Sequence, residues 1–143
     1  MLFNLLKEKN YQNYDIINLC EDLPKPYLEF TEDSHKGFRK LFDLICNDLE
    51  LKVKEPKHHI YSNFFIAKRD TFKSYQDLLI KSIELLENKY KDLAWRDSGY
   101  IGLNKENLKK YTGLDYYPFH AFILERLMSL WIDNENIKTL NLL

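Results

Sequence analysis

The sequence of 143 residues has little glycine, proline and cysteine, and it has no excess of either charge. Glycine and proline occur four times each, which excludes collagen-like and low-complexity chains. Lysine and arginine number 21 against 22 aspartates and glutamates, a net charge of −1. This balance disfavours a general nucleic-acid binder, which normally carries a basic excess. No apolar run approaches the roughly 18 residues of a membrane span, and no basic segment precedes the apolar start as in a signal peptide.

The two cysteines, Cys20 and Cys46, form no CxxC pair and have no neighbouring histidine at metal-ligand spacing. We expect two buried, reduced thiols in a cytoplasmic protein, with no metal site. The aromatic share is high at 15%, and 45% of the residues are hydrophobic. Such a chain can offset the entropy of folding, so we expect one folded domain over residues 1–143.

Hydrophobic spacing predicts a small sheet with several helices. Strands are expected at 15–20, at 60–67 (dense enough in aromatic and β-branched residues to be buried on both faces), at the lysine-rich edge 51–57 and at the C-terminal end. Helices are expected at 2–9, at 34–50 with Ser34 as N-cap, at 71–92, at 104–110 between Asn104 and Gly113, and after Pro118 up to 132. The proline-bearing segment 21–30 should be extended or looped. The order of elements indicates an α/β or α+β domain, its small sheet packed by three to four helices.

The last predicted helix carries His120, Glu125, Arg126 and Ser129 among bulky apolar neighbours. Charged side chains are almost never fully buried unless they are paired. Glu125 and Arg126 therefore either face a substrate cleft or form structural ion pairs with other segments.

Three polar groups elsewhere are less specific. His58 and His59 precede a predicted strand, where neighbours point to opposite faces, so they cannot easily share one metal ion and can equally face solvent. Asn63 lies in an aromatic segment, where it needs a hydrogen bond if buried and could orient a sugar hydroxyl. Glu32, Asp33 and His35 are expected to form a solvated helix start. No GxGxxG, P-loop, GxSxG or HExxH motif is present, which disfavours the corresponding enzymes.

Two segments together resemble a family of bacterial glycosyltransferase-like proteins of the capsular-polysaccharide and lipopolysaccharide type, which carry a domain of unknown function. Residues 60–79, IYSNFFIAKRDTFKSYQDLL, resemble the family's N-M-F-I-x-K strand with its aromatic helix. Residues 120–132, HAFILERLMSLWI, resemble its late helix G-F-L-x-E-R-L-L-x-x-Y-L. The resemblance covers about residues 58–133.

The resemblance implies a GT-A-like fold and transfer of a sugar from a nucleotide sugar to a growing glycan in surface polysaccharide synthesis. Asn63 and Lys68 match the strand motif, and Glu125 and Arg126 match the E-R pair. In this reading Glu125 is the catalytic residue, either as an acid/base or as an orienting group. The expected substrate contacts are Asn63, His59, Tyr61, Arg126 and His120. His120 stands where the family usually has a small residue or glycine.

The chain has no D-x-D motif, and too few residues precede the matching region to build a nucleotide-binding half. It therefore resembles the C-terminal, acceptor-side half of such a transferase, truncated and inactive without an N-terminal companion half. A divalent metal and the nucleotide sugar belong to the complete enzyme, and the expected partners are a sugar nucleotide or glycan acceptor and no nucleic acid. The alternative is a small non-catalytic protein-interaction domain, since Tyr, Phe and Trp are favoured at interfaces.

Overall fold

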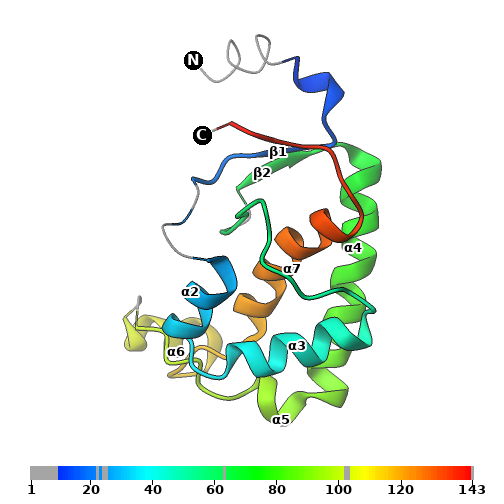
Figure 1. The fold of residues 1–143 in the computed structure, drawn as a ribbon. Coiled ribbons are helices and arrows are strands. Elements are labelled where there is room, and N and C mark those ends of the chain that lie inside the picture. The colour runs from blue at the N-terminus through cyan, green and yellow to red at the C-terminus, as the bar shows by residue number, and fades with distance from the viewer. Residues whose placement is uncertain (1–9, 22, 24–25, 63, 102–103, 143) are drawn as a thin grey trace.

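The computed structural model describes residues 10–21, 23, 26–62, 64–101 and 104–142 (Figure 1). The expected helix at 2–9 and Asn63 lie outside these residues. The strands are β1 (Ile16–Asn18), β2 (Phe65–Ala67) and β3 (Thr139–Asn141). The helices are α2 (Tyr27–Ser34), α3 (Phe38–Asp48), α4 (Arg69–Glu84), α5 (Lys91–Ala94), α6 (Lys105–Thr112) and α7 (His120–Asn134), with a 3₁₀ turn η1 (Tyr11–Asn13) and a π-helical turn η2 (Leu85–Lys89).

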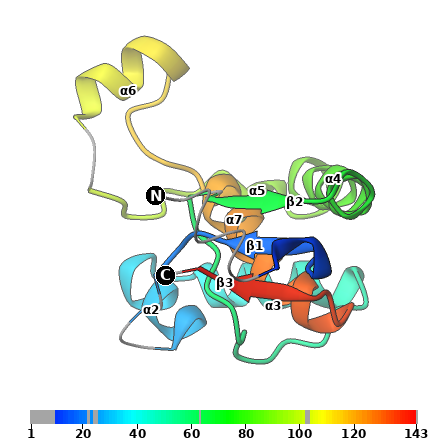
Figure 2. The ribbon, with the colours of Figure 1, turned by 90° about the horizontal axis from the view of Figure 1, so that it is seen from above.

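The sheet has the order β2-β1-β3, with β1 in the middle (Figure 2). β1 pairs antiparallel with β2 and parallel with β3, so that Ile17 lies opposite Ile66 on one side and Leu140 on the other. All three residues of β1 are buried. The prediction of a mixed α/β domain with a small sheet and surrounding helices is confirmed.

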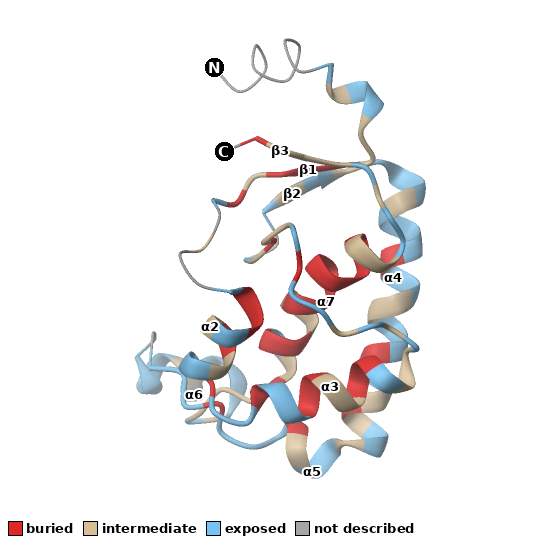
Figure 3. Cartoon of the chain, viewed as in Figure 1, coloured by how far each residue is buried: buried red, intermediate tan, exposed pale blue. Residues whose placement is uncertain are grey.

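Helix α7 is the centre of the fold, as its apolar sequence predicts. Much of α7 is buried (Figure 3), and its buried apolar side chains belong to two hydrophobic clusters. One cluster joins α7 to α3 and contains Phe38, Leu41, Phe42, Ile45, Ile123, Leu127 and Leu130 among others. The other joins α7 to the sheet and α4 and contains Ile16, Ile60, Tyr75, Met128, Trp131 and Ile132. Because α7 contributes to both clusters, it fixes where the sheet lies relative to α3.

The prediction that segment 21–30 is extended or looped is wrong over residues 27–30, which begin α2, whereas the described residues before them, 21, 23 and 26, lie outside any helix or strand. Pro26 stands directly before the first residue of α2, a position where its missing N–H breaks no helical hydrogen bond. Ser34 ends α2 instead of capping the next helix. Gly37, with φ 96°, precedes α3, and its left-handed backbone turns the chain between the two helices.

The strand expected at 60–67 is much shorter than predicted. Only β2 pairs with the sheet, at one edge, and its residues are half-buried or exposed. Residues 60–62 are irregular, and within the described part of the chain no strand forms over 51–57. By contrast, α6 forms as predicted, with the Asn104 side chain accepting a hydrogen bond from the Glu106 N–H and Gly113 left-handed at its end. The C-terminal strand is confirmed as β3.

Both cysteines are free and buried, as expected. Burial raises the pKa of Cys46 to about 12 and also raises the pKa of Cys20, so both thiols stay protonated near neutral pH. In the ranges that the structure describes, no helix is both long enough and apolar enough to cross a membrane.

The central position of α7 predicts where truncation costs most. Ile123→Ala removes a fully buried side chain and should lower the free energy of unfolding by about 2–5 kcal/mol. Ile80→Ala, the matched control on α4, removes a side chain that is 56% exposed and should change it by less than about 0.5 kcal/mol. Urea unfolding of the two variants checks this. Equal losses would contradict the central role of α7.

Candidate functional site

An open cleft of about 710 Å³ lies beside the N-terminal half of α7. Helix α2 lines it from one side, and residues 61–62 and 99–101 complete its walls. The aromatic lining consists of Phe30, Tyr61, Tyr100 and Phe122, and the charged or titratable lining consists of Asp33, His35, Glu125 and Arg126. A concave, largely apolar surface with a few converging polar groups is the usual form of a small-molecule site.

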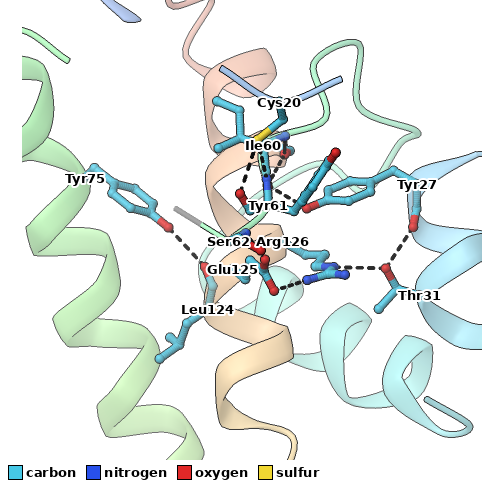
Figure 4. A network of polar contacts seen from close by, with 11 residues as sticks. Cys20, Tyr27, Thr31, Ile60, Tyr61, Ser62, Tyr75, Leu124, Glu125 and Arg126 are labelled. Carbon is cyan, nitrogen blue, oxygen red and sulfur yellow. Dashed lines mark hydrogen bonds and ion pairs between the residues drawn. The ribbon is translucent and has the colours of Figure 1, made fainter. Parts of the chain in front are cut away.

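The guanidinium of Arg126 is buried at this cleft, with the residue only 7% exposed. Its Nη1 pairs with a carboxylate oxygen of Glu125, and its Nε donates to the Thr31 hydroxyl over 3.0 Å (Figure 4). The guanidinium carbon also lies 5.1 Å from the centre of the Tyr27 ring, within cation–π range. A planar cation thus reaches from α7 to α2, with partners on each.

The second carboxylate oxygen of Glu125 accepts a hydrogen bond from the backbone N–H of Ser62. Ser62 has a φ of 52°, a left-handed conformation that is uncommon for a residue with a side chain. Glu125 therefore joins two neighbours, Arg126 on its own helix and the irregular segment after Ile60. Adjacent helical residues do not normally face each other, so this pair forms only because both side chains turn toward the cleft.

Further contacts hold the irregular segment 60–62 against the core. The Tyr27 hydroxyl donates to the Ile60 carbonyl over 2.6 Å, and the Ile60 N–H donates to the Ser129 hydroxyl over 2.9 Å. The N–H of Tyr61 donates to the Cys20 sulfur over 3.3 Å. Burial raises the pKa of Tyr27 well above its usual value, so its hydroxyl remains a donor.

His35 is buried at the end of α2, only 4% exposed, and lines the cleft. Its ring stacks on Phe122, with the ring centres 3.8 Å apart, and its Nδ1 lies 3.2 Å from the carbonyl oxygen of Ser98. Burial, with a smaller contribution from nearby Arg126, lowers the pKa of His35 below its ordinary value. The expectation that His35 belongs to a solvated helix start is wrong, because Phe122 and residues near Ser98 cover it.

The structure brings together three of the residues expected at a site, namely Tyr61, Glu125 and Arg126. His59 lies outside the cleft lining. Its ring stacks on Tyr27 at 5.1 Å, and its Nδ1 accepts a hydrogen bond from the Leu23 N–H. His59 therefore packs against Tyr27, whose ring also contacts the Arg126 guanidinium.

His120, the first residue of α7, also lies outside the cleft lining. Its Nε2 is 2.8 Å from a carboxylate oxygen of Glu87, but neither ring nitrogen has a well-aligned hydrogen bond to any residue that the structure describes. The Trp95 ring meets it edge-on, with the centres 4.9 Å apart. His58, the other histidine considered from sequence, has Nδ1 3.0 Å from the Asn141 side-chain oxygen.

Neither a metal centre nor a known relative explains the cleft. Within the described ranges, no group of three or more His, Cys, Asp or Glu side chains could hold a metal ion. No protein-family model, no curated protein and no solved structure matches the chain.

The buried pair at the cleft predicts a strong coupling between its members. Glu125→Gln removes the charge that neutralises a buried guanidinium and should lower the free energy of unfolding by about 3 kcal/mol. Adding Arg126→Met to this variant removes the unpaired cation, so the double variant should be more stable than the sum of the single losses by about 1–3 kcal/mol. Urea unfolding of the wild type, both single variants and the double variant measures the coupling. Simple additivity would contradict the pairing.

The lowered pKa of His35 predicts a loss of stability in mild acid. In the unfolded chain this residue titrates near its ordinary value of 6.5, whereas in the folded protein it titrates lower. As the pH falls below about 6.5, the unfolded state binds the proton more readily, so the free energy of unfolding decreases. His35→Asn keeps a side-chain N–H for the Ser98 carbonyl and cannot titrate. Unfolding at about pH 7.5 and about pH 5 should show a smaller pH-dependent loss for this variant than for the wild type, and an equal loss would contradict the assignment.

Proposed function

We propose that the chain is a glycosyltransferase-related domain whose cleft holds the acceptor sugar of a nucleotide-sugar-dependent transfer. The resemblance of residues 58–133 to glycosyltransferase-like proteins of surface polysaccharide synthesis motivates the proposal. The observation that carries it is the composition of the cleft. Aromatic rings form its walls, and a fixed carboxylate–guanidinium pair lies among them.

This composition suits a sugar ring. A pyranose has faces of C–H groups and a rim of hydroxyls, so it needs flat apolar surfaces and polar groups at once. Tyr100 and Phe122, 5.4 Å apart between ring centres, provide the flat surfaces. Glu125 and Arg126 provide the polar groups, and the contacts with Ser62 and Thr31 fix their positions.

Glu125 acts in this proposal as an orienting residue. Each of its carboxylate oxygens already accepts one hydrogen bond, from the Ser62 N–H and from Arg126. A carboxylate offers about four acceptor positions, so it can accept a sugar hydroxyl as well while these two bonds hold it in place. This is the orienting alternative of the two roles that the sequence suggests.

The charge of the cleft favours an acceptor over a nucleotide donor. Among the described lining residues, the carboxylates of Asp33 and Glu125 stand against the single guanidinium of Arg126. A nucleoside diphosphate is itself strongly anionic and would meet no net positive field here. We therefore assign the donor, with any divalent metal, to an N-terminal companion half, in keeping with the resemblance.

Sugar binding tests the proposal directly. Calorimetry and saturation-transfer NMR with a panel of methyl hexosides and N-acetylhexosaminides should show saturable binding to the wild-type chain, and UDP should not compete. Tyr100→Ala removes an aromatic wall and should weaken binding about tenfold, since loss of a ring contact of about 1.4 kcal/mol corresponds to that factor.

Tyr111→Ala is the matched control, because Tyr111 is 76% exposed on α6 and does not line the cleft. It should bind sugars as the wild type does. Circular dichroism of both variants checks that each remains folded. Failure of every sugar to bind, or equal weakening by the two tyrosine variants, would overturn the proposal.

A second candidate function, a non-catalytic protein-interaction domain, is favoured by a different face. Helix α4 has exposed stretches along its length (Figure 3), and its exposed large apolar residues are Phe72, Ile80 and Ile83, at 40%, 56% and 44%. Exposed large apolar side chains on one helix are typical of protein interfaces. Absence of sugar binding, together with a concentration-dependent mass in ultracentrifugation that Ile80→Lys abolishes, would favour this function over the first.

A further inference from the structure

We infer that His35 recognises a hydroxyl of the bound sugar, because its Nε2 accepts a hydrogen bond from that hydroxyl. The cleft would then prefer a neutral hydroxylated ligand and bind it more weakly in acid. This inference rests on the proposed function, because it concerns the same cleft. It assigns the recognition of a hydroxyl donor to a residue that the E-R motif does not include.

The ring of His35 is held in one tautomer. Its Nδ1 lies 3.2 Å from the carbonyl oxygen of Ser98, and a carbonyl oxygen can only accept a hydrogen bond. In the neutral ring, Nδ1 therefore carries the proton and Nε2 carries the lone pair. Stacking on Phe122, at 3.8 Å between ring centres, fixes the plane of the ring.

The Nε2 lone pair is available to a ligand. Within the part of the chain that the structure describes, Nε2 has no hydrogen-bond partner, although the residue is only 4% exposed and lines the cleft. The described side-chain atoms that are fully buried without a partner do not include this Nε2, so it keeps some contact with solvent at the cleft, where a ligand hydroxyl can donate to it. The neighbouring Glu125 and Arg126 already bond to each other, to Ser62 and to Thr31.

The surroundings keep His35 neutral near pH 7. Burial disfavours the charged ring, and Arg126 of α7 acts in the same direction, against the opposing effects of the Ser98 carbonyl and Glu125. Asp33 of α2 and the Tyr100 hydroxyl also belong to the cleft lining. A sugar hydroxyl that donates to Nε2 stabilises the neutral ring further. Protonation in acid replaces the acceptor by a positively charged donor, so the hydroxyl can no longer donate to Nε2 and a carboxylate becomes the better partner.

The experiment compares the neutral methyl hexoside that binds the wild-type chain best with the uronic acid of the same sugar. Calorimetric titrations between about pH 8 and about pH 5 should show hexoside affinity falling toward acid, while uronic-acid affinity rises. His35→Asn keeps an N–H for the Ser98 carbonyl and lacks an acceptor at the Nε2 position. It should bind the hexoside about tenfold more weakly at pH 8 and lose the pH dependence.

His35→Gln is the rescue variant, because its longer amide can place an oxygen near the Nε2 position. It should recover much of the hexoside affinity without the dependence on pH. If the hexoside binds the wild type and His35→Asn equally well, or if the pH dependence survives in both variants, the inference is wrong while the proposed function stands. If no sugar binds the wild type, the proposed function fails instead.

The tautomer can be measured without a ligand. The ¹⁵N chemical shifts of the ring nitrogens report which one carries the proton, and the assignment requires a protonated Nδ1 and an unprotonated Nε2 at neutral pH. The opposite tautomer would overturn the inference, whatever the sugar titrations show. Hexoside addition should move the titration of the His35 ring to lower pH, because the bound hydroxyl favours the neutral form.

Discussion

The geometry of the cleft depends on one buried charge, the guanidinium of Arg126. A cation that is 7% exposed must be neutralised and hydrogen-bonded, because the cost of leaving it bare exceeds most single interactions in a fold. Glu125 supplies the charge, Thr31 supplies an acceptor, and Tyr27 supplies a ring face. Meeting the needs of this one side chain draws α2 and α7 together, and the carboxylate is fixed as a consequence.

The same carboxylate helps to hold an irregular segment that runs from the buried Ile60 to the exposed Ser62. Residues 60–62 make no ladder with the sheet, so their buried backbone groups need partners from side chains. Ile60 uses the Tyr27 and Ser129 hydroxyls, Tyr61 uses the Cys20 sulfur, and Ser62 uses Glu125. Of these partners, Glu125 also lines the cleft, so its removal would release Ser62 of the cleft lining as well as uncover Arg126.

What the sequence predicted well was set by local rules. Asn104 and Gly113 delimit α6 through cap chemistry that spans a few residues, and the apolar character of α7 indicates a central helix without knowledge of its neighbours. The failures concern distant partners. The aromatic residues of 60–67 have high strand propensity, but of the described residues in this range only those of β2 pair with a strand. The backbone N–H and carbonyl of Ile60 bond instead to the side chains of Ser129 on α7 and Tyr27 on α2. His35 was missed for the same reason, since its covering ring, Phe122, lies 87 positions along the chain, beyond any local pattern.

The two interpretations of the E-R pair, as a structural ion pair or as part of a substrate cleft, do not exclude each other. A binding site needs polar groups in fixed positions, and the hydrogen bonds that satisfy a buried pair are what fixes them. The pair suits a fixed structural role, because loss of the Glu125 carboxylate would leave the buried Arg126 guanidinium uncompensated. His35 has the complementary properties, with one nitrogen anchored, the other available, and a pKa lowered by burial. The ion pair therefore fixes the positions of α2, α7 and residue 62 around the cleft, whereas the imidazole of His35 can change its protonation when a ligand binds.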